Sequence, residues 1–263
     1  NEAGVRIDTV TPLPECYLAS HQPVGPWPEA PPLDEVYAAF RAAFPGVSVA
    51  GGMHSYFTEL NRFWPPMDAI DAITHSTSAI VHAADDVSVM ETLEALPSVF
   101  RTVRAHAGHT PYHIGPTAIG MRFNPYGAGT VDNPENRRLA MAMADPRQRG
   151  LFNAAWSLGY AARAAVGGVD SLCLSAPTGP FGIMWAPAPW PQPWYARNGE
   201  KAPLFPVFHV IAGLARHGGR PVRAAASSRP AEVAALTVDG AKGPELWIAN
   251  LTAAPREVSV AGF

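Results

Sequence analysis

Short apolar runs alternate with longer amphipathic segments through residues 1–215, and this alternation limits the folds open to the chain. Each short run has the length and content of a β-strand; the runs are Val5–Val10, Val47–Gly51, Ala72–Val81, Tyr112–Ile119 and Ser171–Ser175. The segments with helical spacing of apolar residues are Leu33–Phe44, Val87–Ala105, Gln148–Val166 and Leu204–Arg216. Because strands that alternate with helices are joined by crossovers, we expect adjacent parallel strands in one curved sheet.

The ends of the helices carry their own signals. Asp86 and Asp145 stand where N-caps are expected, and Gly108 and Gly167 stand where helices are expected to end. These signals support the same division of the chain into strands and helices.

The number of strands decides between two architectures. Five strands are too few for a closed eight-stranded barrel, whereas a small doubly wound sheet would bring a glycine-rich phosphate turn that this sequence lacks. Beyond the last helix the pattern is that of an antiparallel meander, with runs at Ala231–Val238, Glu245–Leu251 and Arg256–Val260. The sequence therefore predicts an α/β fold: the C-terminal portion of a (β/α)8 TIM-type barrel over residues 1–218, then part of a small antiparallel β domain over residues 219–263. We expect the protein to continue beyond both ends of this sequence.

Charge and cysteine content disfavour several classes of partner. Only 16% of the residues are charged and the formal net charge is -3, so no basic surface favours nucleic acid or an anionic membrane. No apolar run reaches the ~18 residues of a membrane-spanning helix. Cys16 and Cys173 lie far apart in apolar surroundings, which predicts two buried thiols in a reducing compartment rather than a disulfide. We therefore expect a cytoplasmic protein.

Polar residues that follow barrel strands are candidate site residues, because function in such a barrel collects where the strands end. The segment after Val47–Gly51 offers Tyr56, Glu59, Asn61 and Arg62 close together. A carboxylate serves as acid or base, while amide and guanidinium groups bind hydroxyls or a carbonyl oxygen, so this set predicts a sugar or polyol site. The alternative is a structural salt bridge between Glu59 and Arg62 in an ordered loop.

The next strand is followed by a histidine, a residue type that exchanges a proton near neutral pH. His82 is placed to face the mouth of the barrel, Asp85 is placed to orient it, and Asp86 is placed to cap the following helix. A buried structural role for His82 remains open. His75, inside the strand, is better explained by packing.

Arg122 and Asn124 follow the run Tyr112–Ile119 and are flanked by aromatic residues. This arrangement indicates a substrate clamp rather than a solvated face. We therefore treat Glu59, His82 and Arg122 as candidate catalytic residues, and Tyr56, Asn61, Arg62, Asp85 and Asn124 as candidate substrate-binding residues.

Other chemistry is poorly supported by the residues. Three histidines at metal-like spacing, His106, His109 and His113, precede or open a strand and so belong at the far end of the barrel, where we expect no metal site. We expect no cofactor. No H-E-x-x-H or G-x-S-x-G motif occurs. The segment Ser175–Gly179 ends the last strand without a carboxylate, which disfavours a two-carboxylate glycosidase.

Several short motifs, in their order along the chain, resemble those of the D-apionate lactonase family. They are Phe57–Arg62, Val81–Asp86, Arg122–Pro125, Asp145–Gln148 and Leu151–Gly159, together with Leu246–Thr252 near the C-terminus. The resemblance covers most of residues 47–260 and implies a barrel similar to that of glycoside hydrolases, followed by a β domain. It also implies a Glu-Thr pair near the position that Ala176 and Pro177 occupy here.

The activity implied by the resemblance is hydrolysis of a sugar-derived lactone such as D-apionolactone. Lactone opening needs a base to activate water and a donor for the developing oxyanion. Glu59 and His82 are alternative bases, and Arg122 and Asn61 are alternative donors. Two other functions remain open: a glycosidase whose second acid is Asp85 or lies outside this sequence, and a barrel that binds carbohydrate without turning it over, as the absent carboxylate at Ala176 would allow.

Overall fold

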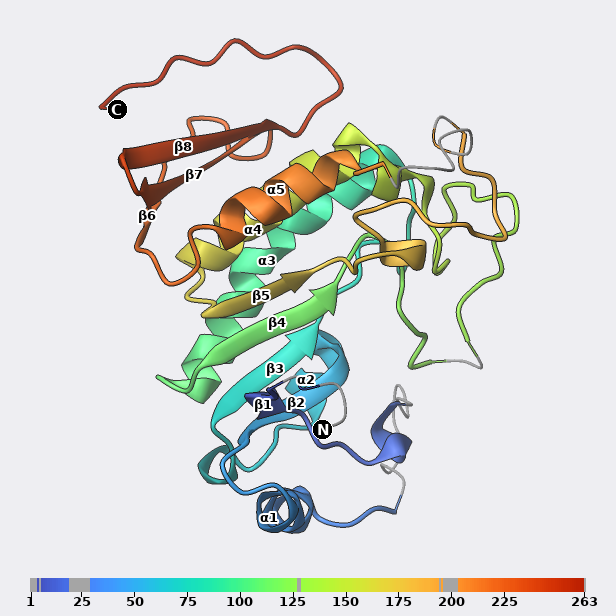
Figure 1. Ribbon diagram of the computed structural model, residues 1–263, viewed down its shortest axis with the longest axis vertical. Helices are drawn as coiled ribbons and strands as arrows, with labels where there is room; N and C mark the ends of the chain where they lie inside the picture. The colour runs from blue at the N-terminus through green and yellow to red at the C-terminus, as the bar shows by residue number, and fades with distance from the viewer. Residues whose placement is uncertain are drawn as a thin grey trace.

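The structure is a computed structural model that describes residues 4, 6–18, 29–126, 129–193, 195 and 203–262. Figure 1 shows two parts: a curled parallel sheet covered by helices, and a small antiparallel sheet beside the C-terminus. The predicted fold class is confirmed. The first residue of the predicted run Val5–Val10 lies outside the described residues.

The parallel sheet has the strand order β1-β2-β3-β4-β5, which is also the order along the chain. Every neighbouring pair is parallel, as expected for strands joined by crossovers. The strands are β1 (Thr9–Val10), β2 (Ser48–Tyr56), β3 (Ala72–Ser76), β4 (Tyr112–Thr117) and β5 (Ser171–Leu174). Their carboxyl ends therefore share one edge of the sheet.

Helices cover the outer face of this sheet. The α-helices are α1 (Leu33–Ala43), α2 (Phe57–Arg62), α3 (Asp86–Ala107), α4 (Leu151–Val166) and α5 (Pro206–Ala215), and the 3-10 helices are η1 (Glu15–Leu18), η2 (Met67–Ala69), η3 (Pro146–Arg149) and η4 (Gly179–Phe181). In Figure 1, α3, α4 and α5 lie side by side, with α4 in contact with both of the other helices and with β5. The predicted apolar stripe of α3, which includes Val89, Leu93 and Phe100, is fully buried there.

Several strand boundaries differ from the prediction: β1 has only the last two residues of its predicted run, β4 and β5 end early, and β2 and β3 differ at their carboxyl ends. β2 continues to Tyr56 and the short helix α2 follows directly, so the expected loop there is wrong. β3 ends at Ser76 rather than Val81. The apolar run continues beyond the strand because Ala79 and Ile80 are buried in the loop that follows it. The expected cap of α3 is also wrong by one residue: the Asp85 carboxylate accepts the hydrogen bond from the Ser88 amide.

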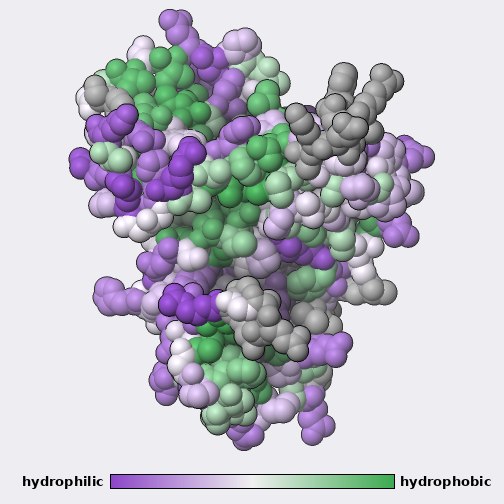
Figure 2. Space-filling model, viewed as in Figure 1, coloured by the Kyte–Doolittle hydropathy of each residue, from purple (hydrophilic) through white to green (hydrophobic). Residues whose placement is uncertain are grey.

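The antiparallel sheet has the order β6-β7-β8, formed by β6 (Val222–Ala224), β7 (Val233–Gly240) and β8 (Gly243–Asn250). The strand expected at Arg256–Val260 is wrong: that segment forms no strand, and its apolar Val258 and Val260 are exposed. The three-residue β6 takes its place and is too short to show a pattern. Apolar side chains gather at this end of the molecule (Figure 2).

The prediction of two buried thiols is wrong. Cys16 is half-buried and Cys173 is exposed, and both are free thiols. On β5, Leu172 and Leu174 pack against the core, so Cys173 between them faces the opposite, inner side of the sheet. Among the helices that the structure describes, none is long and apolar enough to cross a lipid bilayer.

Candidate active site

Side-chain hydroxyl groups fix the carboxyl ends of β3 and β4 to each other. Ser76 Oγ donates to the Pro116 carbonyl at 2.7 Å, and Thr117 Oγ1 donates to the Thr77 carbonyl at 2.9 Å. Thr77 Oγ1 also lies 3.1 Å from the hydroxyl of Tyr160 on α4. These bonds make the edge of the sheet a rigid base for the loops that follow it.

A cavity of about 660 Å³ opens where β2 and β3 end. Apolar side chains of α3 and α4, among them Leu96, Val99 and Trp156, form one wall. The polar residues that line it include Tyr56, Arg62, Thr77, Ser78, His82 and Tyr126. A mostly apolar hollow with a few convergent polar groups is the usual form of a small-molecule site.

Glu59 is fully buried beside this cavity, with 0% of its surface exposed. Its Oε2 accepts the backbone N–H of Tyr56 at 3.1 Å, which closes a capping box at the start of α2. Its Oε1 accepts a short hydrogen bond from the hydroxyl of Tyr126. Arg62 Nη1 is 3.8 Å from Oε1, so the predicted structural salt bridge exists but is the longest of the three contacts.

The loop after β4 is held against this carboxylate by the residues that the sequence singled out. The Tyr56 hydroxyl donates to the Phe123 carbonyl at 2.8 Å, and the two rings stack with centroids 6.0 Å apart. Asn124 Oδ1 accepts the backbone N–H of Tyr126 at 2.9 Å. Burial raises the pKa of Tyr126, the hydrogen bond to Glu59 raises it further, and Arg62 lowers it in part.

Arg122 lies at the base of the same loop and faces the end of β5. Its Nη2 donates to the Ser175 carbonyl at 3.0 Å, and its guanidinium carbon is 4.3 Å from the centre of the Phe181 ring. Its Nε is buried without a hydrogen-bond partner, and burial lowers the pKa of Arg122. The guanidinium is thus held on two sides, by the Ser175 carbonyl and by the Phe181 ring.

Ser175 and Gln148 fix the backbone turn to which Arg122 is hydrogen-bonded. Ser175 has a left-handed backbone (φ 66) that side chains other than glycine rarely adopt. Gln148 Nε2 donates to Ser175 Oγ at 3.2 Å and to the carbonyls of Phe181 and Gly182, which fixes the turn after β5. Neither residue was predicted as part of the site.

Of the other candidates, His82 lines the cavity, whereas Asn61, Asp85 and Arg122 do not. His82 is exposed, so a buried structural role for it is wrong. Asp85 caps α3, and Asn61 is exposed on α2. His75 is buried within β3 and packs against Tyr112, as expected for a packing residue.

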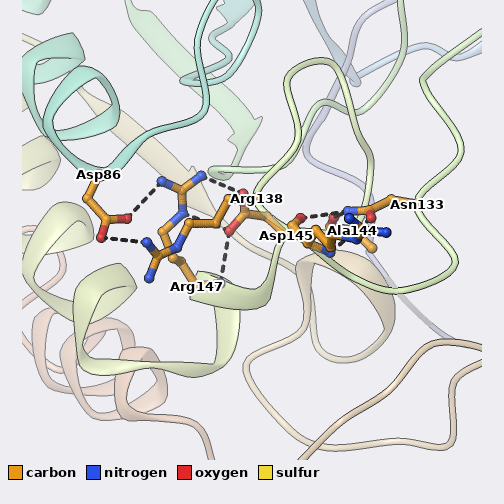
Figure 3. A network of polar contacts seen from close by, with 7 residues as sticks. Asp86, Asn133, Arg138, Ala144, Asp145 and Arg147 are labelled. Carbon is orange, nitrogen blue, oxygen red and sulfur yellow. Dashed lines mark hydrogen bonds and ion pairs between the residues drawn. The ribbon is translucent and has the colours of Figure 1, made fainter.

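A polar network ties the loop before α4 to the start of α3 (Figure 3). At its centre, Arg147 makes a bidentate contact with Asp145 and reaches Asp86, which also pairs with Arg138. Asp145 Oδ1 also accepts the Arg147 backbone N–H, so Asp145 caps the 3-10 helix η3, whereas the N-cap residue of α4 is Gly150. The network anchors the second end of the loop that carries Arg122 and Tyr126.

Comparison with known proteins gives the family. A family model described as "D-apionate lactonase, TIM barrel domain" matches residues 1–219, and one described as "D-apionate lactonase, C-terminal immunoglobulin-like domain" matches residues 230–263. The chain belongs to the D-apionate lactonase family. It is similar to a protein named D-apionate lactonase from Brucella anthropi, with 48% identity over 261 residues, which cover 99% of this chain and 41% of that protein. The chain thus spans about two fifths of the length of this relative.

The resemblance found in the motifs is thereby confirmed. Tyr126 lines the cavity and was missed by the sequence interpretation, although it comes directly after the quoted motif Arg122–Pro125. An Asn-Pro turn with an aromatic residue behind it was the available signal. In the described part of the chain, no three His, Cys, Asp or Glu side chains come together as metal ligands do. His106 is one of the three histidines for which no metal site was expected. Its ring stacks on that of Trp64, with ring centroids 3.8 Å apart.

Proposed function

We propose that this chain carries the active site of a hydrolase that opens a sugar-derived lactone such as D-apionolactone. The observation that supports this function is the 48% identity to a D-apionate lactonase over 99% of the chain, which includes every residue around the cavity. A mostly apolar cavity with hydroxyl, imidazole and guanidinium groups suits a small polyhydroxylated ring. In the same proposal, residues 1–218 form the barrel portion and residues 219–263 the β domain.

Hydrolysis of a lactone joins a water oxygen to the carbonyl carbon and breaks the bond from that carbon to the ring oxygen. The base candidates are His82, exposed in the cavity, and the buried Glu59. Arg122 is proposed for the oxyanion because it is a cation whose guanidinium is held by the Ser175 carbonyl and the Phe181 ring, and preorganised donors stabilise such charge best. Asn61, exposed on α2, is the alternative donor.

The substrate hydroxyls are assigned to the polar residues near the cavity. Arg62 lines it directly, and Tyr56 lines it while its hydroxyl binds the Phe123 carbonyl. Asn124 and Asp85 already accept backbone N–H groups, so in this proposal they bind substrate through their remaining polar atoms. A bound ring would thus meet groups from the ends of β2, β3 and β4.

The test is an assay of the protein, expressed at the full length of its gene, against D-apionolactone, other aldonolactones and aryl glycosides. We expect turnover of lactones, with D-apionolactone the best, and none of the glycosides. Turnover of aryl glycosides alone would instead identify a glycosidase. Binding of the lactone or its hydroxy acid without turnover would identify a carbohydrate-binding barrel.

A further inference from the structure

Glu59 has no surface through which to touch a substrate. None of its surface is exposed, and both carboxylate oxygens are engaged, one by the Tyr56 amide and one by the Tyr126 hydroxyl. A carboxylate in this position acts only through the groups that it binds. The Tyr56 amide is a backbone group at the start of a helix, and Arg62 lies 3.8 Å from Oε1, beyond hydrogen-bond distance. Tyr126 is therefore the cavity-lining side chain that is hydrogen-bonded to Glu59.

Tyr126, in contrast to the buried Glu59, is accessible from the cavity. It is 45% exposed and lines the cavity together with Arg62 and His82. Its side chain therefore joins the buried carboxylate to the space in which a ligand would bind. A phenol hydroxyl both donates and accepts a hydrogen bond, so it is able to serve a ligand and a carboxylate at once.

Four residues singled out from the sequence act together to place this tyrosine. Glu59 holds its hydroxyl, Asn124 holds its backbone N–H, and Tyr56 holds the carbonyl of Phe123 in the same loop. Arg62 lies beside the Glu59–Tyr126 pair. The contacts that unite the predicted site residues thus converge on a residue outside the predicted set.

We propose that Tyr126 is the residue of this site that contacts the reacting atoms of the substrate, and that Glu59 is the positioning residue that holds its hydroxyl. This inference rests on the proposed lactone hydrolysis and identifies the group that handles the proton. It also selects Glu59 over His82 as the residue in which that proton is stored.

The proton movements balance over the two steps. As the water oxygen bonds to the carbonyl carbon, water gives a proton to Tyr126 Oη and Tyr126 gives its own proton to Glu59. When the tetrahedral intermediate collapses, the ring C–O bond breaks and the proton returns from Glu59 through Tyr126 to the ring oxygen. The raised pKa of Tyr126, caused by burial and by Glu59, keeps the phenol neutral between the two transfers.

The test is a double-mutant cycle on D-apionolactone hydrolysis with Tyr126→Phe, Glu59→Gln and the double variant of the full-length protein. Tyr126→Phe should lower kcat by about 100-fold or more and leave KM within about threefold, because only proton transfer is lost. The double variant should be no slower than Tyr126→Phe alone, since Glu59 has no effect on turnover without the phenol hydroxyl.

The matched control is Tyr195→Phe. The Tyr195 hydroxyl also donates one hydrogen bond, to the Arg149 carbonyl at 3.0 Å, but the residue does not line the cavity. This variant should keep the kcat of the unmodified protein. Tyr126→Phe with unchanged kcat, or additive effects of the two substitutions, would overturn the inference alone. An unmodified protein without lactonase activity would overturn the proposed function and the inference with it.

Discussion

At the scale of single residues, the buried His75 ties the stability of the fold to pH. Its Nδ1 lies 2.8 Å from the Ser76 carbonyl and its Nε2 lies 2.6 Å from the Tyr112 hydroxyl, an arrangement that fits a neutral ring. Burial lowers the pKa of His75 from 6.5 to about 4, and the bond to Ser76 opposes this in part. The unfolded chain therefore binds more protons than the folded chain between these two pH values.

We expect the free energy of unfolding to be constant above about pH 6.5 and to fall by up to about 3 kcal/mol as the pH falls towards 4. Urea denaturation across this range measures the slope. His75→Gln should make the slope shallower without abolishing it, because burial also lowers the pKa of His54 and of His113. His82→Asn, at an exposed position, is the control and should keep the slope; an unchanged slope in His75→Gln would contradict the prediction.

Arg122→Ala should raise KM and lower kcat together for D-apionolactone, because the guanidinium would bind the lactone before and during attack on its carbonyl. Removing one preorganised donor typically costs about 10²–10³-fold in kcat. Steady-state kinetics of the full-length protein measure both constants. Arg101→Ala, which removes an exposed arginine from α3, is the matched control. Arg122→Ala with unchanged kcat would remove Arg122 from the oxyanion role.

Candidate site residues that are close together in the sequence could be predicted as a group. The residues that contact them from distant parts of the chain could not. The cluster from Tyr56 to Arg62 lies on one turn of α2 and the strand before it, so its proximity follows from the sequence alone. Glu59 and Tyr126 are 67 residues apart, and only the fold of the loop after β4 brings them together. The full burial of Glu59, which changes its role, depends on that same loop.

At the scale of elements, the network around Arg147 is expected to hold the loop between β4 and α4 in place. Arg147 and Asp145 are 4% and 1% exposed in their side chains, and Asp145 accepts three hydrogen bonds from Arg147. Asp145→Asn leaves the buried guanidinium with only the partly exposed Asp86 as a charge partner, which should cost about 3 kcal/mol of unfolding free energy. Chemical denaturation measures this change.

A neighbouring ion pair gives the control for that prediction. Arg138 contacts Asp86 at 3.0 Å, but the two side chains are 57% and 42% exposed. Arg138→Ala should therefore change the free energy of unfolding by less than about 1 kcal/mol. Equal losses in the two variants would show that burial does not set the strength of this network.

Elements with a regular spacing of apolar residues could be predicted from the sequence. Elements that depend on hydrogen bonding to a neighbouring strand could not. The helices α3 and α4 and the order of the parallel strands follow from apolar spacing and from crossover geometry. The alternating segment Arg256–Val260 fits a strand equally well, yet a strand forms only where a neighbour offers hydrogen bonds. In the antiparallel sheet the third strand is instead β6, which pairs with β7 on the side away from β8 and whose three residues carry no period.

At the scale of the whole molecule, the antiparallel sheet is attached to the barrel through α4 and α5. Arg163 of α4 donates to the Pro230 carbonyl at 2.8 Å, and His217, just after α5, pairs with Glu245 of β8 at 3.1 Å. Trp247 of β8 lies directly over Gly213 of α5, where a Cβ would overlap the Trp247 ring. This close approach requires glycine at position 213, so α5 carries a glycine in its last turn although the residue weakens helices.

Replacement of Gly213 by alanine tests whether this contact joins the two parts. In an exposed helix, Gly→Ala stabilises by about 1 kcal/mol, because alanine loses less conformational entropy on folding. Here the added methyl group would displace Trp247, so we expect Gly213→Ala to lower the free energy of unfolding by about 1–3 kcal/mol. Adding Trp247→Leu should recover part of this loss, because the smaller side chain makes room for the methyl group. Gly129→Ala, whose Cβ would meet nothing within 4 Å, is the open-space control. Urea denaturation of the four proteins measures these differences, and a stabilised Gly213→Ala would show that the sheet does not rest on α5 in solution.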